Sequence, residues 1–183
     1  MPTIFSHAVF AAATGKSFFN QPVSRWFWFL TAVCAIIPDA DVVGFSFGIP
    51  YGAMFGHRGF THSILFALLF GAFAAFIAAR VLQIRVAPVK LFAFFALATL
   101  SHPLLDMLTD GGSGVALFAP FSAERFFFPW RPVKVSPIGL GFFSDRGLIV
   151  ILSEIIWLWL PAFALLITAT IIGKLRRRNQ TPD

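Results

Sequence analysis

Long apolar runs without charged side chains dominate much of the chain. Residues 63–79, 91–105 and 155–173 each form such a run. A helix that crosses a bilayer needs about 20 mostly apolar residues, within a range of about 17–25. The pattern therefore predicts three full membrane spans, of which 91–105 is the shortest.

Two shorter apolar segments, residues 2–15 and 26–38, precede these runs. Asn20, Gln21 and Pro22 lie between them and predict a turn. The second segment is too short for a comfortable crossing. We therefore expect an N-terminal hairpin of two short helices that enters the bilayer partly or crosses a thinned region. A cleaved signal peptide over residues 1–15 is less favoured, because no positively charged segment precedes the apolar run.

Residues 111–147 are rich in Gly, Pro, Phe and Ser. Aromatic side chains are typical of the boundary between membrane and water. We expect this segment to be an ordered interfacial loop over the functional site. The chain as a whole, 1–183, is expected to form a single membrane-embedded domain.

Composition supports the membrane assignment. Hydrophobic residues make up 58% of the 183 residues and charged residues 12%, against about 45–50% and about 25% in soluble domains. A soluble core of this size could not bury so much apolar surface, and a disordered chain would not contain it. The single cysteine, Cys34, excludes a disulfide framework and a Cys-based zinc site. The predicted fold class is an all-α integral membrane helical bundle.

The net charge of +6 does not predict nucleic-acid binding, because most basic residues lie at the ends of apolar runs. Positive residues favour the cytoplasmic side of a membrane. One threading of the chain puts nine of them on that side and makes the C-terminus cytoplasmic. These nine are Lys16, Arg25, Arg80, Arg85, Lys90, Lys174, Arg176, Arg177 and Arg178.

The same threading brings all four histidines and seven of the eight acidic residues to the extracytoplasmic face. Ionisable groups near lipid are costly and often mark function. The residues collected there are His7, Asp39, Asp41, His57, His62, His102, Asp106, Asp110, Glu124, Asp145 and Glu154. This grouping predicts a functional site at that face.

The spacing of these residues is typical of metal ligands. His102 and Asp106 are four residues apart, so they share one face of a helix that Pro103 is expected to kink. Asp39 and Asp41 are two apart in a turn and can face one ion or two neighbouring ions. His57 belongs to a loop, and Thr61 or Phe60 is expected to cap the helix that carries His62.

We therefore predict a site for one or two divalent ions, with zinc expected. Zinc in catalytic sites binds His nitrogen and carboxylate oxygen and keeps a position for water, whose pKa it lowers. Each residue alone has an ordinary alternative, such as a helix-end hydrogen bond, a turn or a polar loop. The predicted ligands are His7, Asp39, Asp41, His57, His62, His102 and Asp106.

Basic residues on the same face are candidates for substrate binding, because guanidinium groups match the geometry of phosphate. They are Arg58, Arg125, Arg131 and Lys134. The alternative is that basic residues here pair with Glu124 and Asp145.

Several motifs together resemble a known family. They are Ser6-His7, Pro38-Asp39-Ala40-Asp41, residues 56–63 (GHRGFTHS), residues 101–106 (SHPLLD), Pro120-Phe121-Ser122 and Phe128-Pro129-Trp130. Over residues 1–140 this set resembles the YdjM-like family of inner-membrane, metal-dependent hydrolases, also labelled LexA-binding. The resemblance implies a multi-pass protein of the inner (plasma) membrane with metal-dependent hydrolase activity.

The His-x-x-x-Asp element is also similar to that of zinc phospholipase C and P1-type nucleases, which cleave phosphodiesters. The chain departs from their pattern because it lacks the further His-x-x-x-Glu element. This second resemblance is short, and it implies a phosphoester substrate rather than a three-zinc site.

The combined interpretation is a membrane-bound hydrolase that cleaves a phosphoester of a lipid or lipid-linked substrate. Asp39 or Asp41 is expected to be a ligand or the general base, and Arg58 is expected to assist catalysis. Membrane lipids are the expected partners. Two alternatives remain open: a divalent-metal transporter or sensor, and a small structural or regulatory subunit.

Overall fold

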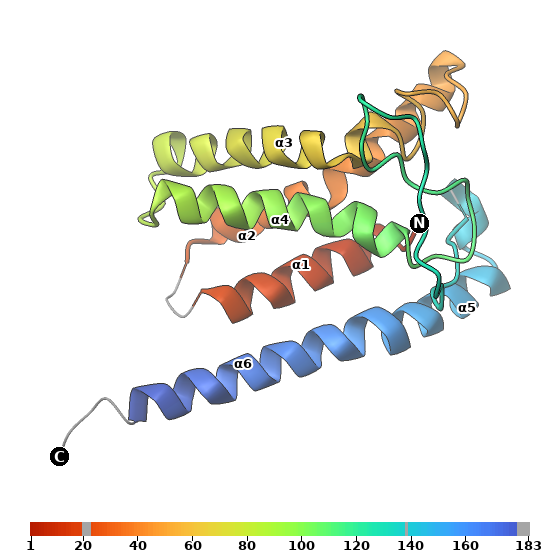
Figure 1. The fold of residues 1–183 in the computed structure, drawn as a ribbon. Coiled ribbons are helices and arrows are strands. Elements are labelled where there is room, and N and C mark those ends of the chain that lie inside the picture. The colour runs from red at the N-terminus through yellow and green to blue at the C-terminus, as the bar shows by residue number, and fades with distance from the viewer. Residues whose placement is uncertain (20–22, 138, 179–183) are drawn as a thin grey trace.

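The computed structural model describes residues 1–19, 23–137 and 139–178. Within these residues the chain forms six α-helices, whose arrangement is shown in Figure 1. They are α1 (Ile4–Phe18), α2 (Arg25–Ile36), α3 (Ile64–Phe76), α4 (Pro88–Asp106), α5 (Asp145–Glu154) and α6 (Leu160–Arg178). The predicted turn at residues 20–22 lies outside the described residues.

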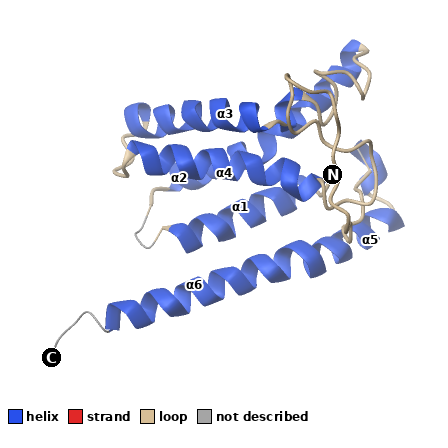
Figure 2. Ribbon diagram, in the orientation of Figure 1, coloured by secondary structure: helices blue, strands red, loops and turns tan. Residues whose placement is uncertain are grey.

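Five shorter helical segments continue or connect these helices. The 3-10 segments are η1 (Ile37–Phe47), η2 (Phe60–His62) and η4 (Gly139–Phe142), and the π segments are η3 (Ile77–Val81) and η5 (Ile155–Trp159). The described residues contain no strand (Figure 2). Two isolated bridges, Thr109 with Val133 and Val115 with Phe126, order the long loop after α4. The predicted all-α helical bundle is confirmed.

Four helical segments are long and apolar enough to cross a membrane: Arg25–Phe47, Ile64–Val81, Pro88–Asp106 and Asp145–Leu175. The first is longer than the sequence predicted, because η1 continues α2 beyond Pro38. Proline fits the first turn of a helical segment, where its missing N–H has no partner to lose. The N-terminal hairpin therefore consists of the short helix α1 and a segment of spanning length.

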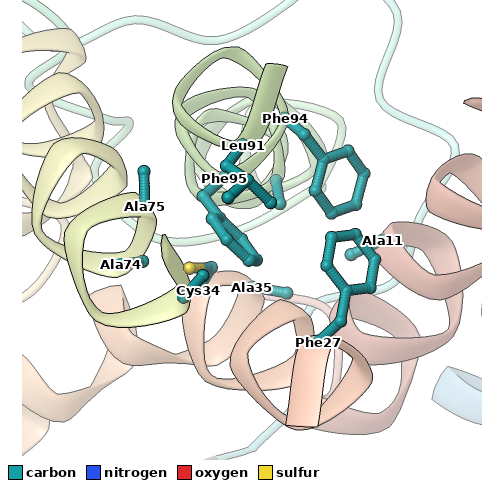
Figure 3. Packing of buried hydrophobic residues seen from close by; sticks show 11 residues of the cluster. Ala11, Phe27, Cys34, Ala35, Ala74, Ala75, Leu91, Phe94 and Phe95 are labelled. Carbon is teal, nitrogen blue, oxygen red and sulfur yellow. The ribbon is translucent and has the colours of Figure 1, made fainter. Parts of the chain in front are cut away.

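Aromatic and alanine side chains from α1 to α4 pack into an apolar core (Figure 3). Phe27 of α2 lies against Phe94 and Phe95 of α4, with ring centroids 5.1 and 5.4 Å apart. α3 approaches α4 closely at Gly71, where a Cβ would lie 2.5 Å from the backbone nitrogen of Ala96. Small residues at such contacts are typical of packed membrane helices.

α6 packs against α1, and apolar side chains on its other side are exposed. α5, η5 and α6 form one continuous helical segment that runs beside α1 (Figure 1). Leu160, Phe163 and Ile167 are among its exposed side chains. Their exposure suits a surface in contact with lipid tails.

The two ends of the bundle differ in character. The long segments before α3 and after α4 gather at one end with the first residues of the chain, and the end of α6 lies at the other (Figure 1). Lys16 is in the last turn of α1, Arg25 begins α2 and Arg80 follows α3, so the basic helix ends lie away from the loops. The structure therefore places Lys16, Arg25 and Arg80 at the helix ends where the sequence predicted basic residues, while the membrane side of each end stays a prediction.

Candidate metal centre

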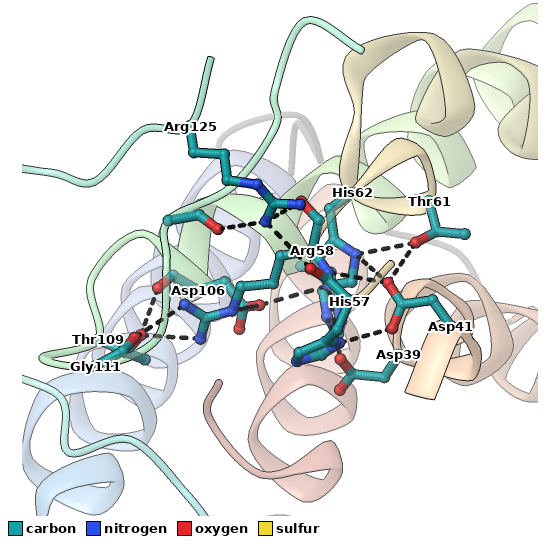
Figure 4. Close-up of polar contacts among 12 residues, drawn as sticks. Asp39, Asp41, His57, Arg58, Thr61, His62, Asp106, Thr109, Gly111 and Arg125 are labelled. Atoms are coloured by element: carbon teal, nitrogen blue, oxygen red, sulfur yellow. Dashed lines mark hydrogen bonds and ion pairs between the residues drawn. The ribbon is translucent and has the colours of Figure 1, made fainter. Parts of the chain in front are cut away.

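A group of buried polar side chains lies where the loops cover the helix ends (Figure 4). We call it the polar cluster, and all seven predicted ligands belong to it together with one arginine. Its members are His7, Asp39, Asp41, His57, Arg58, His62, His102 and Asp106, all of them buried. Five parts of the fold contribute: α1, η1, the loop before η2, η2 itself and α4.

Four of these residues converge on one point. Asp39, His62, His102 and Asp106 each place one ligand atom within 4.8 Å of the others. The Nε2 atom of His102 lies 3.2 Å from Oδ1 of Asp39. The Nε2 atom of His62 lies 3.6 Å from the same oxygen and 3.5 Å from Oδ2 of Asp106. We call these four residues the central group.

The ligand atoms of the central group are buried without hydrogen-bond partners. Within the part of the chain that the structure describes, this holds for Nε2 of His62 and His102 and for both carboxylate oxygens of Asp39 and Asp106. Buried polar atoms without partners are rare, because desolvation is costly. Two imidazole nitrogens and two carboxylates are a donor set that zinc accepts. The central group therefore fits a divalent cation.

The charge of the polar cluster supports the same fit. Three buried carboxylates and one buried guanidinium leave a formal charge of −2 when the histidines are neutral. An uncompensated buried charge costs several kcal/mol per ion. A divalent cation would balance this charge.

His7 lies beside the central group. Its ring stacks on that of His102, with centroids 3.7 Å apart and an interplanar angle of 14°. Its Nε2 atom is 3.7 Å from Oδ1 of Asp106, and both of its ring nitrogens are buried without a hydrogen-bond partner in the described structure. The first helix therefore brings a fifth donor to the site.

Asp41 and His57 occupy a different position, one layer outward. Oδ2 of Asp41 accepts hydrogen bonds from the backbone N–H of Arg58 and from Oγ1 of Thr61. Oδ1 of Asp41 lies 2.7 Å from Nδ1 of His57. Asp41, His57 and His62 form a second group of potential ligands, but the oxygens of Asp41 already have donors.

Asp41 also fixes the direction of His62. Its Oδ2 atom is 3.1 Å from Nδ1 of His62, so Nε2 of that ring points to the central group. Similarly, Nδ1 of His102 lies 2.7 Å from the carbonyl oxygen of Ala35. Histidines that bind metals commonly have their second nitrogen held by a carboxylate or a carbonyl. Both rings are oriented in this way.

The carboxylates around His62 have a larger effect on its pKa than its burial has. Burial alone would lower the pKa of this imidazole, but Asp106, Asp39 and Asp41 raise it well above the usual value. A proton and a cation would occupy the same place on Nε2. These carboxylates favour a positive charge at Nε2, and either a proton or a bound cation can provide it.

Arg58 holds Asp106 from the opposite side. Its Nε atom lies 3.0 Å from Oδ2 of Asp106, while Nη1 and Nη2 donate to the carbonyl of Gly111 and to Oγ1 of Thr109. The residue is fully buried and adopts a φ of 61°, which non-glycine residues rarely adopt. This placement makes Arg58 a support of Asp106.

The loop that carries His57 and Arg58 depends on its glycines. A Cβ at Gly56 would collide with the carbonyl oxygen of Pro50, and one at Gly59 with that of Met54. The chain then forms η2, which contains His62, and Ser63 caps α3 by accepting a hydrogen bond from Phe66 N. The expectation that Thr61 or Phe60 caps a helix carrying His62 is therefore wrong, because His62 precedes the helix.

The other predicted phosphate-binding residues lie outside the polar cluster. The guanidinium of Arg125 donates to backbone carbonyls of five residues: His57, Arg58, Gly114, Tyr51 and Ala53. Arg131 stacks over the ring of Phe127, and Lys134 pairs with Asp110 at 2.9 Å. Arg125 thus joins loop segments, and the pairings of Arg58 and Lys134 are with Asp106 and Asp110 instead of Glu124 and Asp145.

Sequence reasoning assigned no role to Glu154, which is fully buried. Its carboxylate accepts hydrogen bonds from the backbone N–H and the hydroxyl of Thr3 and from the hydroxyl of Ser6. Thr3 is the N-cap of α1. Glu154 therefore fixes the start of the helix that carries His7. The sequence feature that could have indicated this role is the position of Glu154 inside an apolar run.

A Gly-x-Ser-x-Gly pattern occurs at residues 44–48. A serine nucleophile of this type needs a sharp turn between a strand and a helix. Ser46 lies in η1, is exposed, and has no strand before it in the described structure. This pattern therefore has no support as a catalytic element.

Comparison with known proteins shows the family to which the chain belongs. The family model for the YdjM inner membrane protein matches residues 1–178. The chain belongs to the YdjM inner membrane protein family. This YdjM family member is also 40% identical over 167 residues to the inner membrane protein YbcI of Escherichia coli (strain K12), covering 91% of the chain and 95% of the relative. No solved structure matches it. Its assignment as an inner membrane protein with several apolar helices agrees with the sequence prediction.

Proposed function

We propose that this protein is a metal-dependent hydrolase that cleaves a phosphoester of a membrane lipid or lipid-linked substrate. The observation that carries the proposal is the set of buried imidazole and carboxylate atoms in the central group without hydrogen-bond partners in the described structure. Packing alone gives no reason to bury such atoms together. Metal binding with chemistry at the bound ion gives one.

Asp39, His62, His102 and Asp106 would hold the cation, with His7 next to them. Zinc is the expected metal, because the donors are nitrogen and carboxylate oxygen. When bound, such a cation supplies a water of lowered pKa and neutralises charge on the attacked phosphate. The neighbouring residues of the polar cluster would orient the side chains that hold the cation.

Asp41 orients His62, and Arg58 orients Asp106. Asp39 has neither support, and both its oxygens lack a hydrogen-bond partner in the described structure. It can therefore serve as a ligand or accept a proton from the attacking water. Arg131 and Lys134 are exposed and lie outside the polar cluster, and we keep them as candidates for contact with the phosphate. We place the site on the extracytoplasmic side and the C-terminus in the cytoplasm.

A divalent-metal transporter or sensor is the second candidate. Transporter sites typically lie near the middle of the membrane, between broken helices. Here His102 and Asp106 occupy the last turns of α4, and His62 precedes the first turn of α3. The position of the central group at the helix ends favours an enzyme.

Elemental analysis of the purified protein, paired with hydrolysis of labelled lipid phosphates, tests the proposal. We expect bound zinc and a turnover that a chelator abolishes and added zinc restores. His62→Ala and His102→Ala should lose both metal and turnover. Ser101→Ala is the matched control, because within the described residues its hydroxyl bonds only to the carbonyl of Ala98 in its own helix. Unchanged metal content in both histidine variants would exclude the site, and metal without turnover would favour the transporter or sensor.

A further inference from the structure

We propose that the apolar pocket beside Asp39 binds one acyl chain of a phospholipid and directs its phosphate to the central group. The inference rests on the proposed function in one respect, which is that the lipid held there is the substrate. The pocket itself is defined by the structure independently of any reaction.

The pocket has a volume of about 430 Å³ and lies between the first residues of the chain and the segment around η4. This volume is within the range of about 300–1,000 Å³ that is usual for small-molecule sites. Its apolar lining includes Ile4, Phe5, Val42 and Phe142. Such walls favour a hydrocarbon chain over a polar ligand.

Asp39 connects this pocket to the polar cluster. Among the lining residues that the structure describes it is the one acidic side chain, and it is only 6% exposed. The same carboxylate lies 3.2 Å from Nε2 of His102 in the central group. A chain in the pocket would therefore have its polar end next to the proposed cation. The positive charge of that cation complements a phosphate, whereas Asp39 alone would repel it.

The rim of the pocket suits entry from the membrane. Ile4, Phe5 and Phe143 line it and are 48%, 58% and 83% exposed. Large apolar side chains exposed at the ends of membrane helices favour contact with lipid over contact with water. A phospholipid already has its phosphate at this level and its chains in the bilayer.

A second apolar pocket provides an internal comparison. It has a volume of about 360 Å³ and is lined by α1, α2 and α6, including Val9, Lys16 and Phe163. None of its lining residues belongs to the polar cluster. A lipid bound there would not reach the central group.

Photocrosslinking tests the inference without requiring turnover. The zinc-loaded protein is placed in phosphatidylcholine vesicles that contain a trace of phosphatidic acid with a diazirine at the end of one acyl chain. After illumination, mass spectrometry locates the crosslinks. We expect them at residues 1–5, 42 and 139–143, and we expect chelation of the zinc to reduce them.

Val42→Trp should fill the pocket and reduce these crosslinks at least tenfold, because each methylene excluded from an apolar site weakens binding about fourfold. Val43→Trp is the matched control, because Val43 is exposed and does not line the pocket. Ile4→Trp is a second pocket variant, outside the polar cluster. Zinc content measured in each variant separates a filled pocket from a damaged metal site.

The outcomes separate this inference from the proposed function. Crosslinks spread over the outer faces of α3 and α6, or concentrated at residues 163–166, would overturn the inference even if a water-soluble phosphoester is hydrolysed. Crosslinks in the pocket without hydrolysis of any phosphoester would support the chain site and exclude the hydrolase. Retained hydrolysis of a short-chain phosphoester in Val42→Trp, with loss for the long-chain lipid, would support both.

Discussion

α4 contributes to two buried clusters of opposite kind. Its first half gives Leu91, Phe94 and Phe95 to the apolar core, where ring and methyl contacts account for the burial (Figure 3). Its last turns give His102 and Asp106 to the polar cluster, where the buried donor and acceptor atoms of the central group lack hydrogen-bond partners in the described structure. Packing therefore explains the first cluster, whereas the second holds polar atoms that could bind a metal ion.

The largest effect on folding should come from the apolar core. Phe27→Ala removes a ring that packs against Phe94 and Phe95, and such truncations cost about 3–5 kcal/mol. Denaturation of the detergent-solubilised protein should show this loss. Metal bound per folded molecule should stay unchanged, and a parallel loss of metal in the folded fraction would show that the two clusters are not separate.

Removal of the metal should change the stability of the protein through the polar cluster and not through the apolar core. Zinc at 100 times its dissociation constant should stabilise the protein by about 2.7 kcal/mol, because it binds the folded state. Asp39→Asn should lose this increment. It should unfold no more readily than the chelated wild type, since the carboxylate has no hydrogen-bond donor in the described structure.

Thermal unfolding with and without chelator measures this increment. Asp145→Asn, an exposed acidic residue, is the matched control and should keep the zinc-dependent stabilisation. An equal zinc increment in Asp39→Asn would place the ion elsewhere.

Substitution of a supporting residue should have a smaller effect than loss of a ligand. Asp41→Asn keeps the size of the side chain but weakens its hold on Nδ1 of His62. Changes of this kind typically reduce metal affinity or activity about 10–100-fold. Metal titration by calorimetry would measure the change, and total loss of metal would instead make Asp41 a ligand.

The smallest effect should come from the cap of α3. Ser63 accepts a hydrogen bond from Phe66 N, and loss of such a cap costs about 1 kcal/mol. Ser63 directly follows His62, so Ser63→Ala tests whether the helix start also positions the ligand. We expect slightly lower stability with unchanged zinc affinity. A change in affinity above tenfold would show that the cap belongs to the site.

The sequence predicted the apolar spans and the convergence of seven candidate ligands, because both depend on the order of residues along helices. It did not predict that η1 extends α2 past Pro38, since a proline can end a helix or begin a new turn. It also did not separate the positions of Asp39 and Asp41. Their difference depends on Arg58 N and Thr61, which approach Asp41 from a loop whose path requires glycines.

Arg125 shows a second limit of the sequence. Its charge suggested phosphate binding, but its guanidinium donates to carbonyls of segments far from it along the chain. Contacts between irregular segments leave no periodic pattern in a sequence. Such a residue can be assigned only when the path of each loop is known.

The hydrogen bonds between Glu154 and Thr3 join residues that are 151 positions apart. A ribosome therefore synthesises His7 well before the residue that anchors its helix. Until the segment Asp145–Leu175 has been made and inserted, α1 lacks this anchor. Assembly of the site is thus coupled to the arrival of a helix that follows all the other contributors to the site along the chain.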